Sequence, residues 1–359
     1  VVNSPSEAIK PNAQLLHENL ADYRQVKDCY PTEKTNIANH VKIRKGDMAQ
    51  GWSQSEVIAE ASYVLPQSDH LAMETRSARA LIREDGNIII HSTSQSPYII
   101  RKKLSRHFGI DAGKIIVHTP AVGGAFGGKA AVQLEMIAYL ASKAVGGREV
   151  IIINSRTEDM ISSPCRIGLE AKIKLGAAKS GVLKAVELTY LVDCGAYSDM
   201  GSVITKSIAA DCTGPYAIDN VFCDSLCVYT NHPYVTSFRG FGHAEYTMAI
   251  ERTMDLLASK LGMDPLELRM INAIVPGKTT PTQAKLTRSN IGELPGCISR
   301  LKELIKWGEG QRNDLENNKV RAKGLACFWK TSSTPPDAMS GAIVTFTPVG
   351  YDKLNVGAV

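Results

Sequence analysis

The sequence predicts an α+β fold in which mixed and antiparallel sheets carry packed helices. Two kinds of pattern lead to this class. Short apolar or alternating runs end at glycine-containing turns, at 84–86 and 179–181, which is typical of hairpin strands. Longer segments, such as 99–108 and 245–261, carry apolar residues at helical spacing. No internal repeat is visible, so repeat architectures are excluded.

Composition narrows the class of protein further. The 359 residues are 44% hydrophobic, which is enough to bury a core and predicts two domains. The formal charge of +5 is spread along the chain without a basic block, which disfavours nucleic-acid binding. No apolar run approaches the roughly 20 residues that span a membrane. Because no signal-peptide pattern opens the chain, we expect a cytoplasmic protein.

Eight cysteines are present, and none belongs to a C-x-x-C pair. The closest two, Cys223 and Cys227, are four positions apart. This spacing argues against iron–sulfur or zinc ligation within the chain. Disulfides are not expected without a secretion signal, so the cysteines are predicted to be small buried hydrophobic residues.

The first half of the chain predicts a linker followed by a hairpin and two helices. Residues 1–50 are polar with scattered prolines and are assigned to the tail of a preceding domain and a linker. Strands are predicted at 78–83 and 87–92, and Pro97 then opens a helix that ends at Gly109. Another apolar helical face follows within 130–144.

The second half predicts strands followed by helices. A short buried strand is expected at 150–153, a loop at 155–159, and three antiparallel strands at 168–175, 182–192 and 221–229. The helix at 245–261 is followed by a second one whose N-cap is Asp264 with Pro265 in its first turn, and by a third at 297–307. A last hairpin is expected at 341–346 and 353–359. Because the sequence opens without methionine and ends inside a strand, we expect a fragment or a processed piece.

A glycine-rich loop at 122–129, Val-Gly-Gly-Ala-Phe-Gly-Gly-Lys, lies between an apolar run and a helix. Glycines let a backbone turn sharply and bring its N–H groups close to an anion. Gly123 to Lys129 fit the G-x-x-x-x-G-K pattern of a phosphate loop, and Asp193 could be its acidic partner. However, Ala130 stands where a magnesium-binding hydroxyl is required. A purely structural turn is a further alternative.

Two other short stretches accompany this loop. Residues 92–97 read Ser-Thr-Ser-Gln-Ser-Pro, and residues 237–242 read Ser-Phe-Arg-Gly-Phe-Gly. In this order, within about residues 50 to 275, the three stretches resemble motifs of the molybdenum hydroxylases, the xanthine dehydrogenase and aldehyde oxidase family. We therefore interpret the chain as similar to the molybdopterin-binding subunit of that family.

The resemblance implies a cofactor site built from these motifs. In this family a molybdenum atom, held by the pterin and not by protein side chains, carries out the oxidation of an aldehyde or N-heterocycle carbon with oxygen from water. Cofactor-binding residues would be Gln95, Gly124, Phe126, Gly127 and Arg239. Phe241 and Ala130 would face the substrate. The resemblance further implies molybdopterin, with or without a cytosine nucleotide, and 2Fe–2S clusters and often FAD on partner domains or subunits.

The sequence departs from the pattern of this family in two respects. Purine-oxidising members place a glutamate at the position of Ala130, so xanthine is disfavoured and an aldehyde or a less polar heterocycle is favoured. The family's base glutamate lies in a second molybdopterin-binding domain, so no catalytic side chain is expected in this chain. We assign 51–310 to the first molybdopterin-binding domain and 311–359 to a linker and the incomplete start of the second. A cofactor-free scaffold piece of the same fold remains an alternative.

Overall fold

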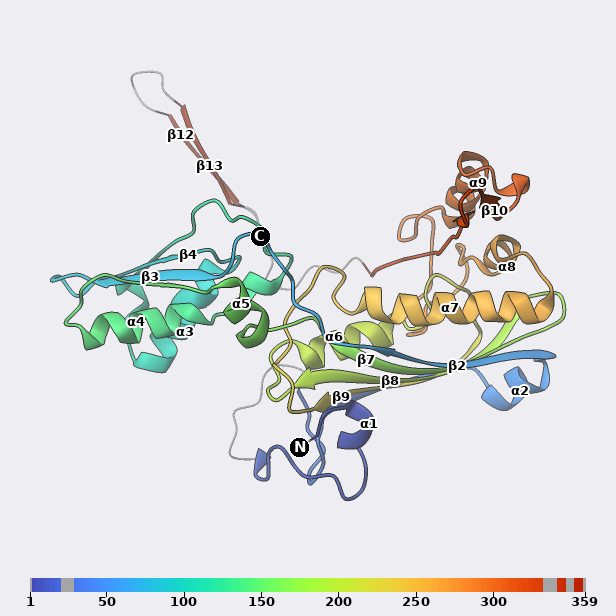
Figure 1. The fold of residues 1–359 in the computed structure, drawn as a ribbon, viewed down its shortest axis with the longest axis horizontal. Coiled ribbons are helices and arrows are strands. Elements are labelled where there is room, and N and C mark those ends of the chain that lie inside the picture. Colours follow the sequence, from blue (N-terminus) through green and yellow to red (C-terminus); the bar gives the residue numbers. More distant parts are fainter. Residues whose placement is uncertain (1, 21–28, 332–340, 347–351, 358–359) are drawn as a thin grey trace. The chain divides into compact units, whose positions relative to one another are not determined.

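The structure is a computed structural model that describes residues 2–20, 29–331, 341–346 and 352–357. The chain divides into two compact units, Val1–Phe328 and Trp329–Val359. The first unit contains a five-stranded sheet and a four-stranded sheet with their helices, a small two-stranded hairpin, and all the predicted site residues (Figure 1). In the second unit, β12 (Gly341–Phe346) pairs antiparallel with β13 (Asp352–Gly357), which confirms the last predicted hairpin.

The larger sheet has five strands in the order β1-β9-β8-β7-β2. Their bounds are β1 Ile37–Lys45, β2 Val57–Leu65, β7 Gly168–Ala177, β8 Leu183–Gly195 and β9 Asn220–Tyr229. The helices α6 (Gly201–Ala210) and α7 (His243–Leu261) lie along one side of this sheet, whereas α1 (Pro5–Ala8) and α2 (Met48–Ser53) lie along the other (Figure 1). Alternate residues of β7 and β8, such as Ile173 and Leu188, are fully buried in the core that includes α7.

One prediction for this sheet is wrong. The strands β8 and β9 are parallel, not antiparallel. The reason is α6, which the sequence analysis did not predict: parallel neighbours need a crossover connection, and α6 supplies it. Residues 1–50, which the sequence assigns to a tail and a linker, include β1, and β1 is an edge strand of this sheet. The domain boundary predicted at residue 50 therefore falls between two strands of one sheet.

The smaller sheet has four strands in the order β5-β4-β3-β6. Their bounds are β3 Ser77–Ile82, β4 Ile88–Ser92, β5 Ile115–His118 and β6 Val150–Ile153. The predicted hairpin of β3 and β4 is confirmed, with Gly86 in the left-handed region. Residues of α3 (Pro97–Phe108) and α4 (Leu134–Ala144) form one core with the sheet. The strand β6 was expected to be buried, but it is an edge strand, and Ile153 is 66% exposed.

The remaining helices follow their capping residues. Asp264 accepts hydrogen bonds from the first turn of α8 (Pro265–Asn272), as predicted, and α9 spans Leu294–Leu304. The expected loop at 155–159 is instead the start of α5 (Arg156–Ser162), where Ser155 and Glu158 form a reciprocal capping box. A small hairpin of β10 (Arg312–Leu315) and β11 (Lys319–Ala322) follows. Seven cysteines are buried and Cys297 is exposed; all eight are free thiols.

Candidate functional site

The glycine-rich loop forms a strained arch over residues 124–127, which we call the Phe126 arch. Phe126 has a φ of 55°, and Gly124 and Gly127 have φ values of 103° and 102°. A left-handed conformation costs a residue with a side chain roughly 1–2 kcal/mol, so surrounding contacts must maintain it. Gly127 cannot carry a side chain, because a Cβ would lie 2.5 Å from the carbonyl oxygen of Ser237. The arch therefore presents the half-exposed Phe126 ring at a fixed position.

A second arch, residues 239–242, repeats this geometry and is called the Phe241 arch. Phe241 has a φ of 53° between Gly240 at 111° and Gly242 at 91°. A Cβ on Gly242 would lie 2.7 Å from the Ile208 side chain of α6. Both predicted aromatic site residues thus occupy left-handed positions; Phe241 lies directly between two glycines, and Phe126 lies between Ala125 and Gly127.

Hydrogen bonds join the two arches and the glutamine segment. The N–H of Arg239 donates to the carbonyl oxygen of Phe126 at 2.9 Å, and the N–H of Gly127 donates to Oε1 of Gln95 at 3.0 Å. The backbone N–H of Gln95 donates to the carbonyl oxygen of Lys129 at 3.0 Å. The joined segments enclose a shallow depression with about 330 Å³ of free space. It is lined by Gln95, Phe126, Gly127, Ser237, Phe238, Arg239, Gly240 and Phe241.

The contact with Gly127 orients the Gln95 side-chain amide. Since Oε1 accepts from a backbone N–H, the amide nitrogen is left as the group that can donate elsewhere. Within the described part of the chain, that nitrogen has no hydrogen-bond partner, and the residue is exposed. Gln95 therefore offers a directed N–H donor at the depression.

Arg239 is the only charged residue among the eight that line the depression. It is exposed, and its side chain has neither a hydrogen bond nor an ion pair with any described residue. The depression thus combines a free cation, a free amide donor, the exposed ring of Phe126 and the partly buried rings of Phe238 and Phe241. This set suits a flat ligand that carries anionic or acceptor groups.

An ion pair next to the Phe126 arch stabilises the glycine-rich loop. Nζ of Lys129, a residue only 3% exposed, lies 2.6 Å from Oε2 of Glu74. Glu74 also accepts from the N–H of Gly123 at 2.8 Å. Burial raises the pKa of Glu74, but the bonds from Lys129 and Gly123 outweigh it and leave that pKa below its ordinary value. The phosphate-loop alternative fails here, because the lysine that it needs is itself buried and is paired with the Glu74 carboxylate.

A second ion pair supports the same loop. Arg76 donates to the carbonyl oxygen of Gly128 at 3.0 Å and to Oδ1 of Asp159 at 3.1 Å. Asn154 and Ser163 also donate to that carboxylate oxygen, each at 3.2 Å. Burial opposes ionisation of Asp159, but the charge and hydrogen bonds of Arg76 and its neighbours hold its pKa below the usual value.

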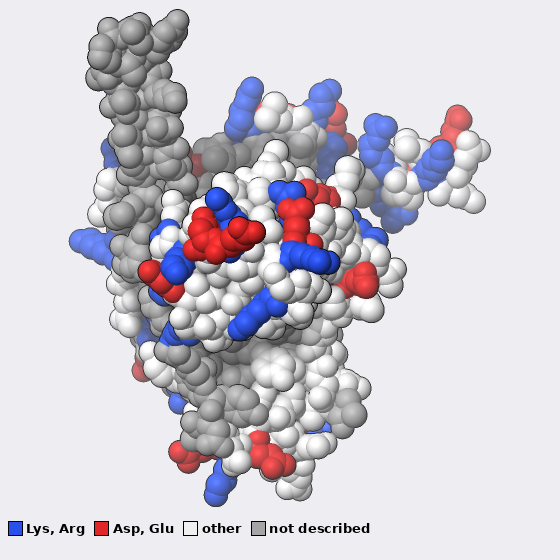
Figure 2. Space-filling model, turned by 90° about the vertical axis from the view of Figure 1, so that its left-hand side faces the viewer, with Lys and Arg blue, Asp and Glu red and all other residues white. Residues whose placement is uncertain are grey.

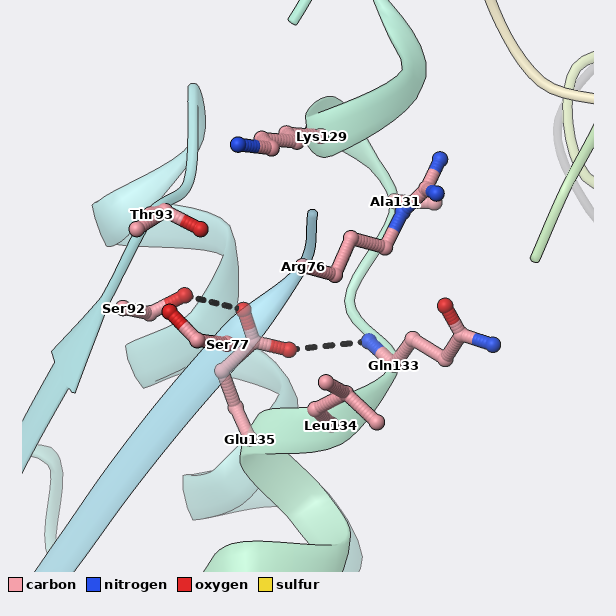
Figure 3. Close-up of a pocket in the computed structure, with 9 residues that line it drawn as sticks. All are labelled: Arg76, Ser77, Ser92, Thr93, Lys129, Ala131, Gln133, Leu134 and Glu135. Atoms are coloured by element: carbon pink, nitrogen blue, oxygen red, sulfur yellow. Dashed lines mark hydrogen bonds between the residues drawn. The ribbon is translucent and has the colours of Figure 1, made fainter. Parts of the chain in front are cut away.

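A small cavity lies among the side chains that support this loop (Figure 3). The Glu135 carboxylate lies at its edge, bonded to Oγ of Ser92 at 2.6 Å and to the N–H of Gln133 at 2.9 Å. The free space is about 10 Å³, which holds at most about one water molecule. The cavity is therefore part of the support and too small to bind a substrate.

The Phe241 arch is held by a stack of aromatic and cationic groups. The Phe238 ring lies 4.3 Å from the His70 ring at an interplanar angle of 17°, and the Arg166 guanidinium lies 3.8 Å from its centre. His70 donates from Nε2 to the carbonyl oxygen of Ser237 at 2.7 Å. Burial lowers the pKa of His70, with Arg76 and Arg166 also opposing its charge, so the ring is neutral. This stack fixes the residue immediately before Arg239.

The family described as molybdopterin cofactor-binding domain matches residues 29–273 of this chain. The match covers both sheets and both arches. This chain belongs to that family. The molybdopterin-binding chain is also 34% identical to a probable xanthine dehydrogenase subunit of Bacillus subtilis (strain 168), over 80% of this chain and 36% of that protein.

Further comparisons agree on the fold. The molybdopterin-binding chain is 28% identical, over its whole length and 46% of the relative, to the xanthine dehydrogenase molybdenum-binding subunit of Escherichia coli O157:H7. The solved aldehyde oxidoreductase of Desulfovibrio gigas matches with a TM-score of 0.77 at 28% identity, over 87% of this chain and 33% of that one. The chain thus spans less than half the length of these relatives. The predicted family and the α+β fold are confirmed.

The structure brings most of the predicted site residues together. Gln95, Phe126, Gly127, Arg239 and Phe241 all line the depression. Two predicted residues do not line it. Gly124 lies at the start of the Phe126 arch, and Ala130 ends the short 3₁₀ turn Gly128–Ala130 that follows it.

Supporting residues that the sequence analysis missed are isolated polar residues, and their partners are distant in sequence. Arg76 bonds to Asp159 83 positions away, and Arg166 bonds to Oε1 of Glu245 at 2.8 Å, 79 positions away. Asp193, the rejected phosphate-loop partner, accepts from the N–H of Gly195 at the end of β8 and from Thr230, which directly follows β9. No local motif in the sequence marks these pairs.

Membrane insertion and metal ligation by side chains have no support among the described residues. None of the described helices is long and apolar enough to cross a membrane. The same residues contain no cluster of three or more potential metal-ligating side chains. On the face shown in Figure 2, basic and acidic side chains are interspersed and form no patch of a single sign.

Replacement of Asp159 by asparagine is expected to lower the free energy of unfolding by about 2 kcal/mol at neutral pH, since Arg76 loses its charged acceptor. The pKa of Asp159 is depressed in the folded state, so its stabilising effect exists above the unfolded pKa of about 3.9 and disappears as the pH falls through the folded value. The wild-type advantage should therefore shrink below about pH 4. Denaturant unfolding across pH measures this. If the difference in unfolding free energy between wild type and Asp159→Asn did not change with pH, the assignment would be contradicted. Asp314→Asn, at an exposed aspartate, is the control.

Proposed function

We propose that this chain forms one wall of the cofactor site of a molybdenum hydroxylase of the xanthine dehydrogenase and aldehyde oxidase type. The main support is that Gln95, Phe126 and Arg239 all line one depression. Among the described residues, the amide nitrogen of Gln95 has no acceptor and the Arg239 side chain has no partner. Family membership identifies the ligand class as molybdopterin. The whole enzyme would oxidise an aldehyde or an N-heterocycle carbon.

The residues present fit this cofactor. When bound, it would supply a two-electron oxidation of a substrate carbon, with oxygen derived from water. Gln95 would donate its free N–H to an acceptor on the cofactor, and Arg239 would interact with its anionic part. Gly124, Phe126 and Gly127 would let the backbone approach it closely.

Phe241 would hold a flat substrate by aromatic packing. Its ring position is fixed by the left-handed backbone of the arch, so the substrate plane would be set before binding. Ala130 does not line the depression itself; it would face a part of the substrate that extends beyond it, without offering a hydrogen bond. A methyl group cannot pair with purine nitrogens, which favours an aldehyde or a less polar heterocycle over xanthine.

A proton acceptor must come from outside the depression. None of its eight lining residues is a carboxylate or a histidine, the side chains that most often act as general bases. We therefore propose that a glutamate from another stretch of the protein acts as general base, and that no side chain of this chain is catalytic in that sense.

The same proposal includes the partners. Electrons would pass to 2Fe–2S clusters, and onward to FAD where present, on other domains or subunits, and the pterin would carry a cytosine nucleotide or none. Residues 51–310 would form the first molybdopterin-binding domain, and 311–359 a linker and the start of a second. A cytoplasmic location is proposed on the sequence grounds given above.

Molybdenum and pterin analysis of the protein, purified with all its natural domains and subunits, tests this function. We expect close to one molybdenum and one pterin per copy of this chain. A well-folded assembly that contains neither, when isolated from molybdate-supplied cells, would support the cofactor-free scaffold and defeat the proposal. Magnesium-dependent ATP binding, which the phosphate-loop alternative requires, is expected to be absent.

A further inference from the structure

A buried histidine lies directly beneath the Phe241 arch. His243 is the first residue of α7, and its side chain is 1% exposed. Its Nδ1 lies 2.9 Å from the carbonyl oxygen of Gly240, and its Nε2 lies 2.7 Å from Oδ2 of Asp211. The Asp211 side chain is 4% exposed. Both ring nitrogens therefore face acceptor oxygens at hydrogen-bond distance.

The Gly240 carbonyl is held by two groups of the same residue. Its oxygen accepts from the backbone N–H of His243 at 3.2 Å and lies 2.9 Å from the ring Nδ1. Asp211, the C-cap residue of α6, orients the ring through its contact with Nε2. The imidazole therefore connects the end of α6 to the Phe241 arch.

Other side chains surround the imidazole. Glu245, two residues along α7, is almost fully buried and accepts from Arg166 at 2.8 Å. The rings of Tyr246 and Phe328 lie 5.3 Å and 6.2 Å from the imidazole. The helix itself begins without a side-chain cap, because Gly242 occupies the N-cap position in a left-handed conformation. The histidine contact is thus made to the arch and not to the helix end.

We propose that His243, paired with Asp211, is a positioning residue for the cofactor site. It holds the carbonyl of Gly240 and so fixes the peptide between Gly240 and Phe241. The Arg239 cation and the Phe241 ring would then be aimed at the depression before any ligand binds. The functional part of this inference rests on the proposed molybdenum hydroxylase function, whereas the contacts of His243 do not.

The positioning role is tested in the complete, cofactor-loaded enzyme with Asp211→Asn and His243→Gln. We expect normal molybdenum content, an altered Mo(V) electron paramagnetic resonance signal, and a KM raised about tenfold or more because Arg239 and Phe241 are misplaced. Asp211→Asn preserves shape if His243→Gln fails to fold. His40→Gln is the matched control, since His40 pairs with Asp224 between β1 and β9.

The outcomes separate this inference from the proposed function. A wild-type enzyme without molybdenum would defeat the function itself. A loaded wild type whose two variants fold, and whose spectrum and KM equal those of His40→Gln, would overturn the positioning role alone.

Discussion

Replacement of Gln95 by alanine is expected to lower kcat by about 10²- to 10³-fold, the usual effect of removing one directed donor from a site where charge develops. The donor is directed because Oε1 is already bonded to the N–H of Gly127 at 3.0 Å. Folding should change little, since Gln95 is exposed and its backbone bond to Lys129 does not involve the side chain. The measurement is steady-state kinetics of the complete enzyme, alongside thermal unfolding.

Two further variants make this prediction sharper. Gln50→Ala removes an exposed glutamine from α2 and should leave kcat unchanged. Gln95→Glu keeps the oxygen toward Gly127 but replaces the free donor with an acceptor, so it should be as slow as Gln95→Ala. If Gln95→Glu kept wild-type kcat, donation by Gln95 would be excluded.

Replacement of Arg269 by methionine is expected to lower the free energy of unfolding by about 3–5 kcal/mol, because a buried carboxylate loses its counter-ion. Arg269 is fully buried and lies between α7 and α8. Its Nε donates to Oε2 of Glu251 at 2.8 Å, and its Nη2 donates to Asp255 at 2.9 Å. Tyr216 and the N–H of Cys327 also donate to Glu251, but both are neutral groups.

Chemical denaturation followed by far-ultraviolet circular dichroism checks this value. Arg252→Ala is the matched control, since Arg252 also pairs with Asp255, at 3.2 Å, but with 66% of its side chain exposed. It should cost less than about 1 kcal/mol. Adding Glu251→Gln to Arg269→Met should restore part of the loss, because the unpaired charge is removed. Equal losses in Arg269→Met and Arg252→Ala would contradict this account of the core.

Local chemistry explains which elements the sequence could predict. The turn at Gly86, the helix end at Gly109 and the cap at Asp264 depend on residues within a few positions of each other, and all three are present. The start of α5 could also have been predicted, since Ser155 and Glu158 form a capping-box pattern. The parallel pairing of β8 and β9 could not, because strand direction depends on how the connecting segment crosses the sheet.

The candidate site also has one part that the sequence predicts and one part that it does not. Its three motifs are contiguous in sequence, so resemblance identified the residues that line the depression. The supports beneath them are single residues such as Arg76 and His243, whose partners lie 32 to 83 positions away. One sequence contains no signal for such pairs, because burial of a charge depends on packing between elements. The exposure of β6 was missed for a related reason: an apolar run does not reveal whether its strand lies at the edge of a sheet.

Anomalous X-ray scattering at the molybdenum absorption edge, from crystals of the complete enzyme, tests the central claim most directly. We expect a single molybdenum peak at the depression, close enough to the Gln95 amide nitrogen for that nitrogen to donate to the cofactor, with Phe126 and Arg239 on its near side. A molybdenum peak bordered by other residues, with Gln95 and Arg239 facing only solvent, would contradict the claim that these three segments form the cofactor site.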